Sequence, residues 1–292
     1  MSVFVQQSGS VCEFSNSDSW VIHSPIEQSI KRKIEAVGTP LKDWDINIYR
    51  GVLTGYNEAF IISTEKRDEI LANCQTEDER TRTAELIRPI LRGRDIKRYG
   101  YNWANLWLIN THNGIRGKLE RVHIEDNPAI KAHLDQYWDK ISKRADKGDT
   151  PYNLRNCAYL EDFSKPKILW KRVGSILRFC YNDNEALGLD STCFAIGNNI
   201  EFVCCVLNTP MGHYLLKDAP KTGTGDLLIS VQAVEPIKLP SVTHELNIEF
   251  KRLLEMMIAN CSDDIENEIS QKIFNLYGLS HEEQRYIEEN FT

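Results

Sequence analysis

Hydrophobic positions with helical spacing define the first element of the chain. Within residues 24–37, apolar side chains recur every three or four positions, at Ile26, Ile30, Ile34 and Val37. Ser24 precedes this run as a candidate cap, Pro25 occupies the first helical position, and Glu27 stands three residues after the cap. The pattern predicts a capped helix over residues 24–37, which Gly38-Thr39-Pro40 brings to an end.

Shorter apolar runs predict strands that alternate with helical patterns. Strands are expected at Trp44–Tyr49, Ala59–Ser63, Leu106–Ile109, Lys167–Val173, Ile176–Cys180, Cys193–Ile196 and Ile229–Val231. Residues 65–90 look mainly helical, as do residues 127–145. The run Glu201–Leu207 fits a strand or a helix equally well. We therefore expect an α+β fold, with a mixed αβ domain that contains several β-strands.

The last fifty residues have a different character from the rest. Pro236 and Pro240 flank Ile237-Lys238-Leu239, which we interpret as the exit from the αβ body. Two amphipathic patterns and a short third helix, capped by Ser280 with Glu283, follow. Eleven acids and four bases lie between Glu245 and Thr292. We divide the chain into residues 1–240 and an acidic, helical segment, residues 241–292, suited to protein contact or solvent.

Outside that acidic segment the chain is neutral overall, but its cations are clustered. Between Arg88 and Arg98 it carries five cationic side chains against one acid, and Lys140–Arg172 has nine bases against four acids. Pro89 and Gly93 interrupt the first run, so it is expected to be a presented turn rather than a helix face. Arginine donors match phosphate oxygens and guanine edges. A solvated, charged turn is the alternative interpretation.

Composition limits the compartment and the class of protein. No apolar stretch approaches the length of a membrane span, and the N-terminal residues lack the features of a signal peptide, so no membrane partner is expected. Eight cysteines include Cys12, and none forms a Cys-x-x-Cys pair or a zinc-type spacing. We expect the cysteines to be free thiols, as is typical of proteins in the reducing cytoplasm, and therefore expect a cytoplasmic location.

No constellation of residues suited to catalysis can be identified. An adenine methyltransferase needs a D/N-P-P-Y/F tetrad, and Asn127-Pro128-Ala129-Ile130 lacks both the second proline and the aromatic residue. The glycine-rich stretch Thr222–Asp226 follows Pro220 rather than a strand, so we interpret it as a surface loop. Aromatic residues, including Trp103, Trp107 and Trp138, are interspersed among the basic segments. We expect most of them to lie in the hydrophobic core.

Several segments, taken in their order and spacing, resemble one family. They are Ile48–Ile62, Ile87–Tyr99, Asn127–Leu134, Lys143–Gly148, Tyr152–Arg155, Lys165–Ile168, Glu266–Ile269 and Leu276–Leu279. Together they are similar to the TaqI-like C-terminal specificity domain of type IIG restriction–modification enzymes and related adenine-specific DNA methyltransferases. The likeness extends from about Trp20 to Glu288. It implies a DNA target recognition domain, related in fold to the recognition domains of type I specificity subunits, over residues 1–240. Residues 241–292 would then be a helical spacer or docking segment.

In that family the domain follows an S-adenosylmethionine-dependent methyltransferase, which a nuclease often precedes. This sequence has neither unit, so we expect a fragment or a separately encoded specificity polypeptide that is inactive alone. No cofactor is expected in this chain; S-adenosylmethionine and Mg²⁺ would belong to the catalytic domains. The expected partners are double-stranded DNA and methyltransferase or nuclease domains, in the same chain or another.

The resemblance implies a function and a set of DNA-facing residues. The function is recognition of a duplex sequence, which orients DNA for N6-adenine methylation and cleavage by catalytic domains. A specificity subunit that docks a catalytic subunit without strong DNA binding is the alternative. Asp95 is open to a second role, pairing with a neighbouring arginine to hold the turn. The DNA-facing candidates are Thr54, Tyr56, Asn57, Arg92, Arg94, Lys97, Arg98, Arg155, Lys171 and Arg172.

Overall fold

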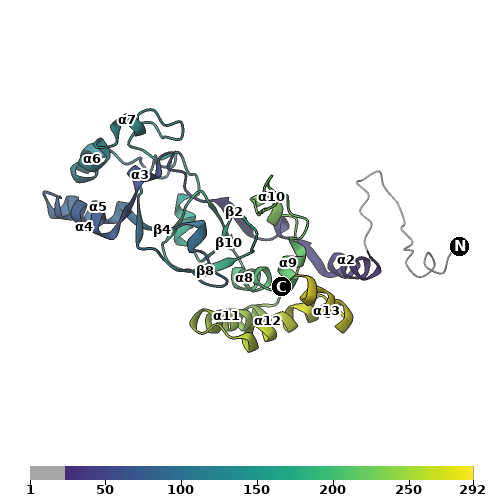
Figure 1. The fold of residues 1–292 in the computed structure, drawn as a ribbon. Coiled ribbons are helices and arrows are strands. Elements are labelled where there is room, and N and C mark those ends of the chain that lie inside the picture. Colours follow the sequence, from purple (N-terminus) through teal and green to yellow (C-terminus); the bar gives the residue numbers. More distant parts are fainter. Residues whose placement is uncertain (1–23, 292) are drawn as a thin grey trace.

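Two four-stranded sheets with helices around them form the body of the molecule, and three further helices lie along one side (Figure 1). The structure is a computed structural model that describes residues 24–291. Cys12 and the N-terminal residues lie outside this range. The prediction that the N-terminus is not a signal peptide therefore concerns residues that the structure does not describe. Helices and sheets are mixed along the chain and helices end it, so the α+β prediction is confirmed.

The first sheet is antiparallel throughout. Its strands, in spatial order, are β2 (Ile46–Arg50), β10 (Thr192–Gly197), β6 (Lys167–Lys171) and β8 (Phe179–Asn182). Phe194 on β10 lies opposite Tyr49 on one side and Leu169 on the other. Helix α8 (Ile200–Asn208) packs on this sheet, and all its residues except Glu201 are buried. A helix that is apolar on every side must be interior, which settles the ambiguity at residues 201–207 in favour of a helix.

The second sheet lies toward the other end of the body. Its strands are β3 (Ile61–Ser63), β5 (Leu106–Ile109), β4 (Ile87–Leu91) and β9 (Leu187–Gly188), and only β4 and β9 run parallel. Ile90 of this sheet belongs to the same hydrophobic cluster as Leu169 and Phe194 of the first sheet, so one core joins the two sheets. Around this sheet lie α3 (Asn57–Phe60), α4 (Thr64–Ala72), α5 (Glu77–Leu86), α6 (Pro128–Asp135) and α7 (Trp138–Ile141).

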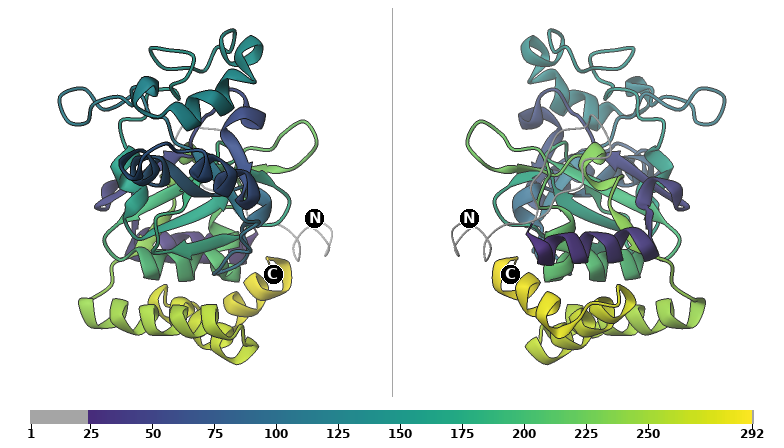
Figure 2. Two further views of the ribbon diagram at one scale, coloured as in Figure 1. Left: turned by 90° about the vertical axis from the view of Figure 1, so that its left-hand side faces the viewer. Right: turned by 90° about the vertical axis from the view of Figure 1, so that its right-hand side faces the viewer.

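The acidic C-terminal segment is helical, as predicted. Its helices α11 (His244–Ala259), α12 (Asp263–Leu276) and α13 (His281–Asn290) lie side by side beneath the body (Figure 2). Phe250 on α11 packs edge to face on Phe202 of α8, with ring centroids 5.0 Å apart. Lys33 on α2 (Pro25–Val37) forms a 2.6 Å ion pair with Glu283 on α13. These helices share a hydrophobic cluster with α8 and α2, so they are packed into the body.

The predicted start of the first helix is confirmed in detail. Ser24 and Glu27 form a reciprocal capping box, and Pro25 occupies the first helical position. The helix ends at Val37 before Gly38-Thr39-Pro40, as predicted. Two strands nearby were not predicted: Gly38–Pro40 forms strand β1, and Lys238–Pro240 forms its antiparallel partner β12. The pairing joins residues 200 positions apart, and no local pattern reports it.

Three other predicted elements are corrected by tertiary pairing. The strand expected at residues 59–63 begins only at Ile61, and the helical stretch 65–90 ends in strand β4. Residues 229–231 are not a strand: the strand there is β11 (Leu227–Leu228), which pairs with β7 (Val173–Gly174), and helix α10 begins at Val231. The arginine-rich run is likewise part strand, since Arg88 belongs to β4, and only its later part is a turn. The remaining elements are β7 (Val173–Gly174), β11 (Leu227–Leu228), α9 (Pro210–Leu215), α10 (Val231–Val234) and the 3-10 turns Leu41–Asp43, Gly93–Asp95, Ile124–Asp126 and Leu160–Ser164.

Two global properties concern the described residues. None of the helices in residues 24–291 is both long enough and apolar enough to cross a membrane. The seven cysteines in this range are free thiols, and Cys180, Cys193, Cys204 and Cys205 are buried. Burial raises the pKa of the Cys193 thiol to about 11, so this thiol stays protonated and packs as a small apolar side chain.

Candidate nucleic-acid interface

The turn that follows strand β4 is held by Asp95. Its carboxylate accepts hydrogen bonds from the backbone nitrogen of Arg92 at 2.8 Å, from Nε of Arg92 at 3.0 Å and from Nη2 at 2.8 Å. Asp95 is only 5% exposed. Burial opposes its charged form, but the hydrogen bonds from Arg92 outweigh burial and hold the pKa of Asp95 below its ordinary value. Asp95 therefore has the second of its two expected roles: it pairs with a neighbouring arginine, Arg92, and holds the turn.

Arg94 takes no part in these hydrogen bonds and lines a basic hollow of about 230 Å³. The basic hollow is lined by Gly93, Arg94, Ile96, Lys171, Gly174, Ser175, Ile176 and Arg178. Three of these side chains are cationic and none is acidic. Within residues 24–291, Arg94, Lys171 and Arg178 form no side-chain hydrogen bond or ion pair. Their charges are therefore available to an anion outside the chain.

Gly93 makes this assembly of cations possible. A Cβ atom on Gly93 would lie 2.8 Å from Cγ of Lys171 and 3.2 Å from the carbonyl oxygen of Ser191. The Gly93 amide also donates to Oγ of Ser191 at 3.2 Å. Because any larger residue would push the turn off the end of strand β6, glycine is needed to bring Arg94 beside Lys171. Two segments about eighty positions apart in sequence thus meet at the basic hollow.

Most residues of the basic hollow, including Arg178 and Ile176, were not among the predicted site residues. Arg178 falls within the strand predicted over residues 176–180, but the strand β8 begins only at Phe179, and Arg178 ends the preceding loop. Ile176 lies in the same loop and is 60% exposed, although it is a large apolar residue. The available signal was the pair Gly174-Ser175, which marks a turn between the two predicted strands, and Ile176 and Arg178 follow this turn.

The other cations of the arginine-rich run lie elsewhere. Arg98 donates from Nη2 to the carbonyl oxygen of Asn208 and forms an ion pair with Glu266 on α12. It therefore links the body to the C-terminal helices. Lys97 is half-buried, and its backbone amide donates to Gly100 at 2.9 Å. Its amino group has no hydrogen-bond partner among the described residues.

Arg172 and Arg155 differ from Lys171 in their surroundings. The backbone of Arg172 bridges Ser191 at 3.0 Å and Ile229 at 2.8 Å, while its side chain is half-buried. Its Nε is buried without a partner in the described part of the chain. Arg155 is exposed and forms a 2.9 Å ion pair with Asp146, outside the basic hollow. Lys171 alone of these three lines the basic hollow.

The loop that contains Thr54, Tyr56 and Asn57 is held by its own contacts. Thr54 is 2% exposed, and its hydroxyl donates to Oδ1 of Asn57 at 2.5 Å. The hydroxyl of Tyr56 donates to Glu58 at 2.5 Å. The buried guanidinium of Arg144 donates to the carbonyl oxygen of Thr54, and burial lowers the pKa of Arg144 to about 10. None of the three lines the basic hollow, so the structure does not bring this loop into it.

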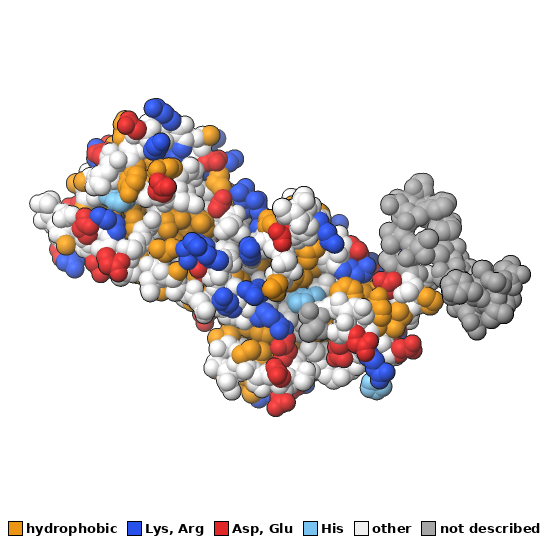
Figure 3. Space-filling model, viewed as in Figure 1, with side chains coloured by type: hydrophobic (Ala, Val, Ile, Leu, Met, Phe, Trp, Pro, Cys, Tyr) orange, Lys and Arg blue, Asp and Glu red, His pale blue; other side chains and the backbone are white. Residues whose placement is uncertain are grey.

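Cationic side chains are also concentrated on a larger scale. Figure 3 shows lysine and arginine side chains across the middle of one face, over the region where Figure 1 labels β8, β10 and α8. Acidic side chains gather on the C-terminal helices below and at the opposite end. The chain therefore presents a local basic surface despite its net charge of −7.

Comparison with known proteins finds a match in structure only. No protein-family model matches the sequence, and no curated protein matches it. The fold is similar to part of the type IIL restriction–modification enzyme MmeI, solved in complex with DNA, with a TM-score of 0.59 and 10% sequence identity over 87% of this chain. It is also similar to part of the type IIG restriction endonuclease BpuSI, with a TM-score of 0.53 and 11% identity over 91% of this chain.

These similarities define the class of fold. The chain has a fold that occurs within type II restriction–modification enzymes, and it spans about a third of their length: 36% of the MmeI chain and 32% of the BpuSI chain. At such low identity the likeness shows the fold alone. The expected resemblance is thus confirmed at the level of a related fold, and the TaqI-like specificity domain in particular stays a prediction.

Proposed function

We propose that this chain is a recognition module for double-stranded DNA in a type II restriction–modification system, of the TaqI-like specificity type. It would orient the duplex for N6-adenine methylation, and for cleavage, by catalytic domains that this chain does not contain. In this proposal the chain holds no cofactor of its own. S-adenosylmethionine and Mg²⁺ belong to the catalytic domains.

The basic hollow is the observation that carries this proposal. Arg94, Lys171 and Arg178 converge there without an acidic residue among the lining side chains. A cation without an internal partner loses no ion pair when it meets a phosphate, and it releases the counterions condensed on DNA. Gly93 allows the turn to lie against Lys171 and Ser191, which brings Arg94 beside Lys171. The fold shared with MmeI, which was solved in complex with DNA, supports the same conclusion.

The proposal assigns different tasks to the predicted DNA-facing residues. Arg94 and Lys171 would contact phosphates, and Arg178 joins them. Arg92 would act indirectly, since its guanidinium is bound to Asp95 and holds the turn. Phosphate contacts position a duplex but carry no sequence information. Bases would be read from neighbouring loops, for which Thr54, Tyr56 and Asn57 remain proposed contributors.

Duplex binding as a function of salt tests this proposal. The full chain is titrated into a fluorescently labelled 30-base-pair duplex at several salt concentrations, and anisotropy gives the affinity. If each of the three cations neutralises one phosphate, the slope of log K against log salt is about −2.7. Affinity that is undetectable at low salt, or that does not change with salt, would contradict DNA recognition.

A second candidate function is docking of a catalytic subunit by the C-terminal helices. Three apolar side chains on α11 are exposed: Ile248, Met256 and Ile258. Deleting the helices is a poor test, because Phe250 and Leu253 of the same helix are fully buried in the core. Replacing Ile248 with Glu is sharper. Loss of association with a methyltransferase subunit, with unchanged duplex affinity, would support docking as an additional role.

A further inference from the structure

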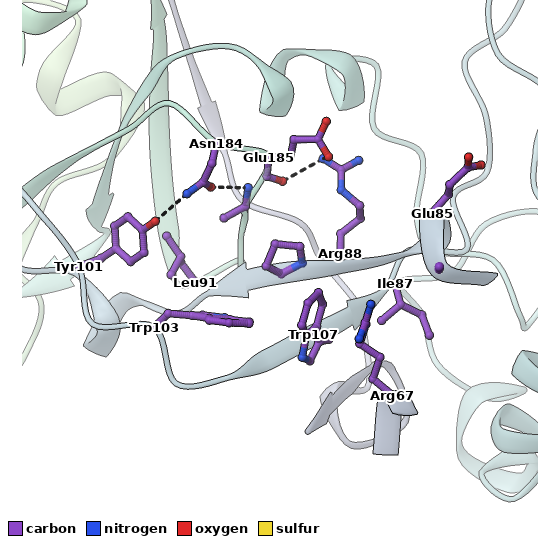
Figure 4. Close-up of a pocket in the computed structure, with 13 residues that line it drawn as sticks. Arg67, Glu85, Ile87, Arg88, Leu91, Tyr101, Trp103, Trp107, Asn184 and Glu185 are labelled. Atoms are coloured by element: carbon purple, nitrogen blue, oxygen red, sulfur yellow. Dashed lines mark hydrogen bonds and ion pairs between the residues drawn. The ribbon is translucent and has the colours of Figure 1, made fainter. Parts of the chain in front are cut away.

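A second cavity of the described chain, the aromatic pocket, is separate from the basic hollow. It has a volume of about 710 Å³ and lies between strands β4 and β5 and the turn at residues 184–186 (Figure 4). Its walls include Arg67, Arg88, Pro89, Tyr101, Trp103 and Trp107. The volume falls within the range of about 300–1,000 Å³ that is typical of small-molecule sites.

The indole N–H groups of both tryptophans are satisfied within the chain. Nε1 of Trp103 donates to the carbonyl oxygen of Leu106 at 3.0 Å, and Nε1 of Trp107 donates to Oγ1 of Thr64 at 3.0 Å. The two rings meet edge to face, with centroids 5.1 Å apart. The guanidinium of Arg67 lies 4.2 Å from the centroid of the Trp107 ring. Both indoles are therefore fixed in orientation before any ligand binds.

The opposite wall is also held in place. Oδ1 of Asn184 accepts hydrogen bonds from the amide of Ala186 at 2.9 Å and from Nδ2 of Asn182 at 3.0 Å. Nδ2 of Asn184 donates to the hydroxyl of Tyr101 at 2.6 Å, as Figure 4 shows. The carbonyl oxygen of Asn184 accepts from the buried Lys167 at 2.5 Å. The pocket is therefore preorganised on both sides.

The charges in the walls select the kind of guest. Arg67 uses Nη1 to bind Asp68, and Arg88 uses Nη2 to bind Glu185. The other terminal nitrogen of each guanidinium has no partner among the described residues. The lining contains two glutamates, Glu85 and Glu185, beside the two arginines, so its formal charge is balanced. A neutral planar ring with oxygen and nitrogen acceptors suits such walls, because the arginines offer free N–H donors. Nucleobases have this chemistry.

Strand β4 and the turn that follows it connect the aromatic pocket to the basic hollow. Leu91, the last residue of β4, lines the aromatic pocket, and Gly93, the first residue of the 3-10 turn, lines the basic hollow. A DNA strand that follows this connection from the basic hollow would reach the pocket.

We propose that the aromatic pocket binds an unpaired nucleobase of the DNA that the basic hollow holds, with the base stacked on Trp103. This proposal rests on the proposed function and deepens it. Stacking on an aromatic side chain contributes about 1–3 kcal/mol for each base, roughly five- to 150-fold in affinity. A base that is already unpaired needs no disruption of the helix, so a bulged or overhanging base binds better than a paired one.

The test uses 2-aminopurine, a fluorescent base that is quenched when it stacks. The full chain is titrated into three oligonucleotides that carry it in a paired position, in a one-base bulge, or in a single-stranded overhang. Each titration is repeated with Trp103→Leu, with the milder Trp103→Phe, and with the control Trp138→Leu. Trp138 is 43% exposed on α7 and does not line the pocket. Circular dichroism of each variant verifies that it is folded.

The proposal expects at least fivefold tighter binding of the bulge than of the paired duplex, with quenching that Trp103→Leu abolishes and Trp138→Leu retains. Equal affinity of the wild-type chain for bulged and paired duplexes would overturn it, whatever the variants do. Anisotropy of the paired duplex reports the proposed function separately. If paired DNA does not bind, the overhang still tests the pocket: quenching that depends on Trp103 supports it, and absence of quenching refutes it.

Discussion

Asp95 binds the guanidinium of Arg92 through both carboxylate oxygens, at 2.8 and 3.0 Å, at the centre of the arginine-rich turn. Because of this bidentate contact, the Arg92 guanidinium is not free to bind an external anion. The same contact holds the turn around Gly93 in shape. Arg94, two positions further on, is exposed without a partner in the described structure. Two arginines of one short run therefore have different roles: one holds the turn, and the other is presented by it.

Replacing Arg94 or Lys171 with Ala is expected to weaken duplex binding by about tenfold at low salt, because each change removes one phosphate contact. The slope of log K against log salt should fall by about 0.9 for each variant. Lys272→Ala is the matched control, since it removes the same charge from a lysine that is paired with Glu249 and Glu268 on the acidic helices. Equal effects of control and test variants would argue against a localised interface.

Asp95→Asn is expected to destabilise the chain by about 1–3 kcal/mol at pH 7, since a buried, charge-assisted contact is lost. The folded-state pKa of Asp95 lies below its ordinary value near 3.8. Its stabilisation is thus fully present above that value and is lost as pH falls through the folded-state pKa. The difference in unfolding free energy between wild type and variant, from urea melts at pH 7 and at decreasing pH, should shrink toward acid. Asp183→Asn, at an exposed site, is the control variant for the same melts.

Arg144→Met is expected to cost about 3 kcal/mol or more in the free energy of unfolding. The Arg144 guanidinium is buried and donates to the carbonyl oxygens of Thr54, Asp146, Pro151 and Asn153. Methionine preserves much of the packing but leaves these acceptors without a donor, and unsatisfied buried groups are costly. Arg155→Met, at an exposed ion pair nearby, should cost less than about 1 kcal/mol. Thermal and urea unfolding of both variants would distinguish them.

Arg98 and Glu266 are expected to be coupled across the junction between the body and the C-terminal helices. A double-mutant cycle with Arg98→Ala and Glu266→Gln should give a coupling free energy of about 1 kcal/mol, since Arg98 is partly exposed to solvent. Duplex affinity should change little in Glu266→Gln. Strictly additive effects on unfolding would mean that the ion pair does not contribute to holding the helices.

Elements with strong local signals could be predicted from the sequence. Ser24, Pro25 and Glu27 specify a helix start through contacts within four residues, and the strand at Leu106–Ile109 is a short apolar run. Strands β1 and β12 could not be found in this way. They are three residues long and have no period of their own, so they exist only because they pair with each other.

The candidate site follows the same division. The clusters of basic residues at Arg88–Arg98 and Lys140–Arg172 could be identified from the sequence. The sequence also predicted that Asp95 could hold the turn. It could not predict that Arg98 is engaged by Glu266, or that Arg178 joins Arg94 and Lys171. Nor did it predict that Trp103 and Trp107 wall a cavity instead of filling a core.

The sequence by itself therefore determined the local helices, the α+β character and the presence of clustered cations in a chain of negative net charge. Only the tertiary structure decided which of those cations lack an internal partner. The physical reason is that periodicity and capping depend on neighbours a few positions away. Whether Arg94 is free and Arg98 is paired depends on side chains from segments far along the chain, which meet only when the two sheets and the C-terminal helices pack together.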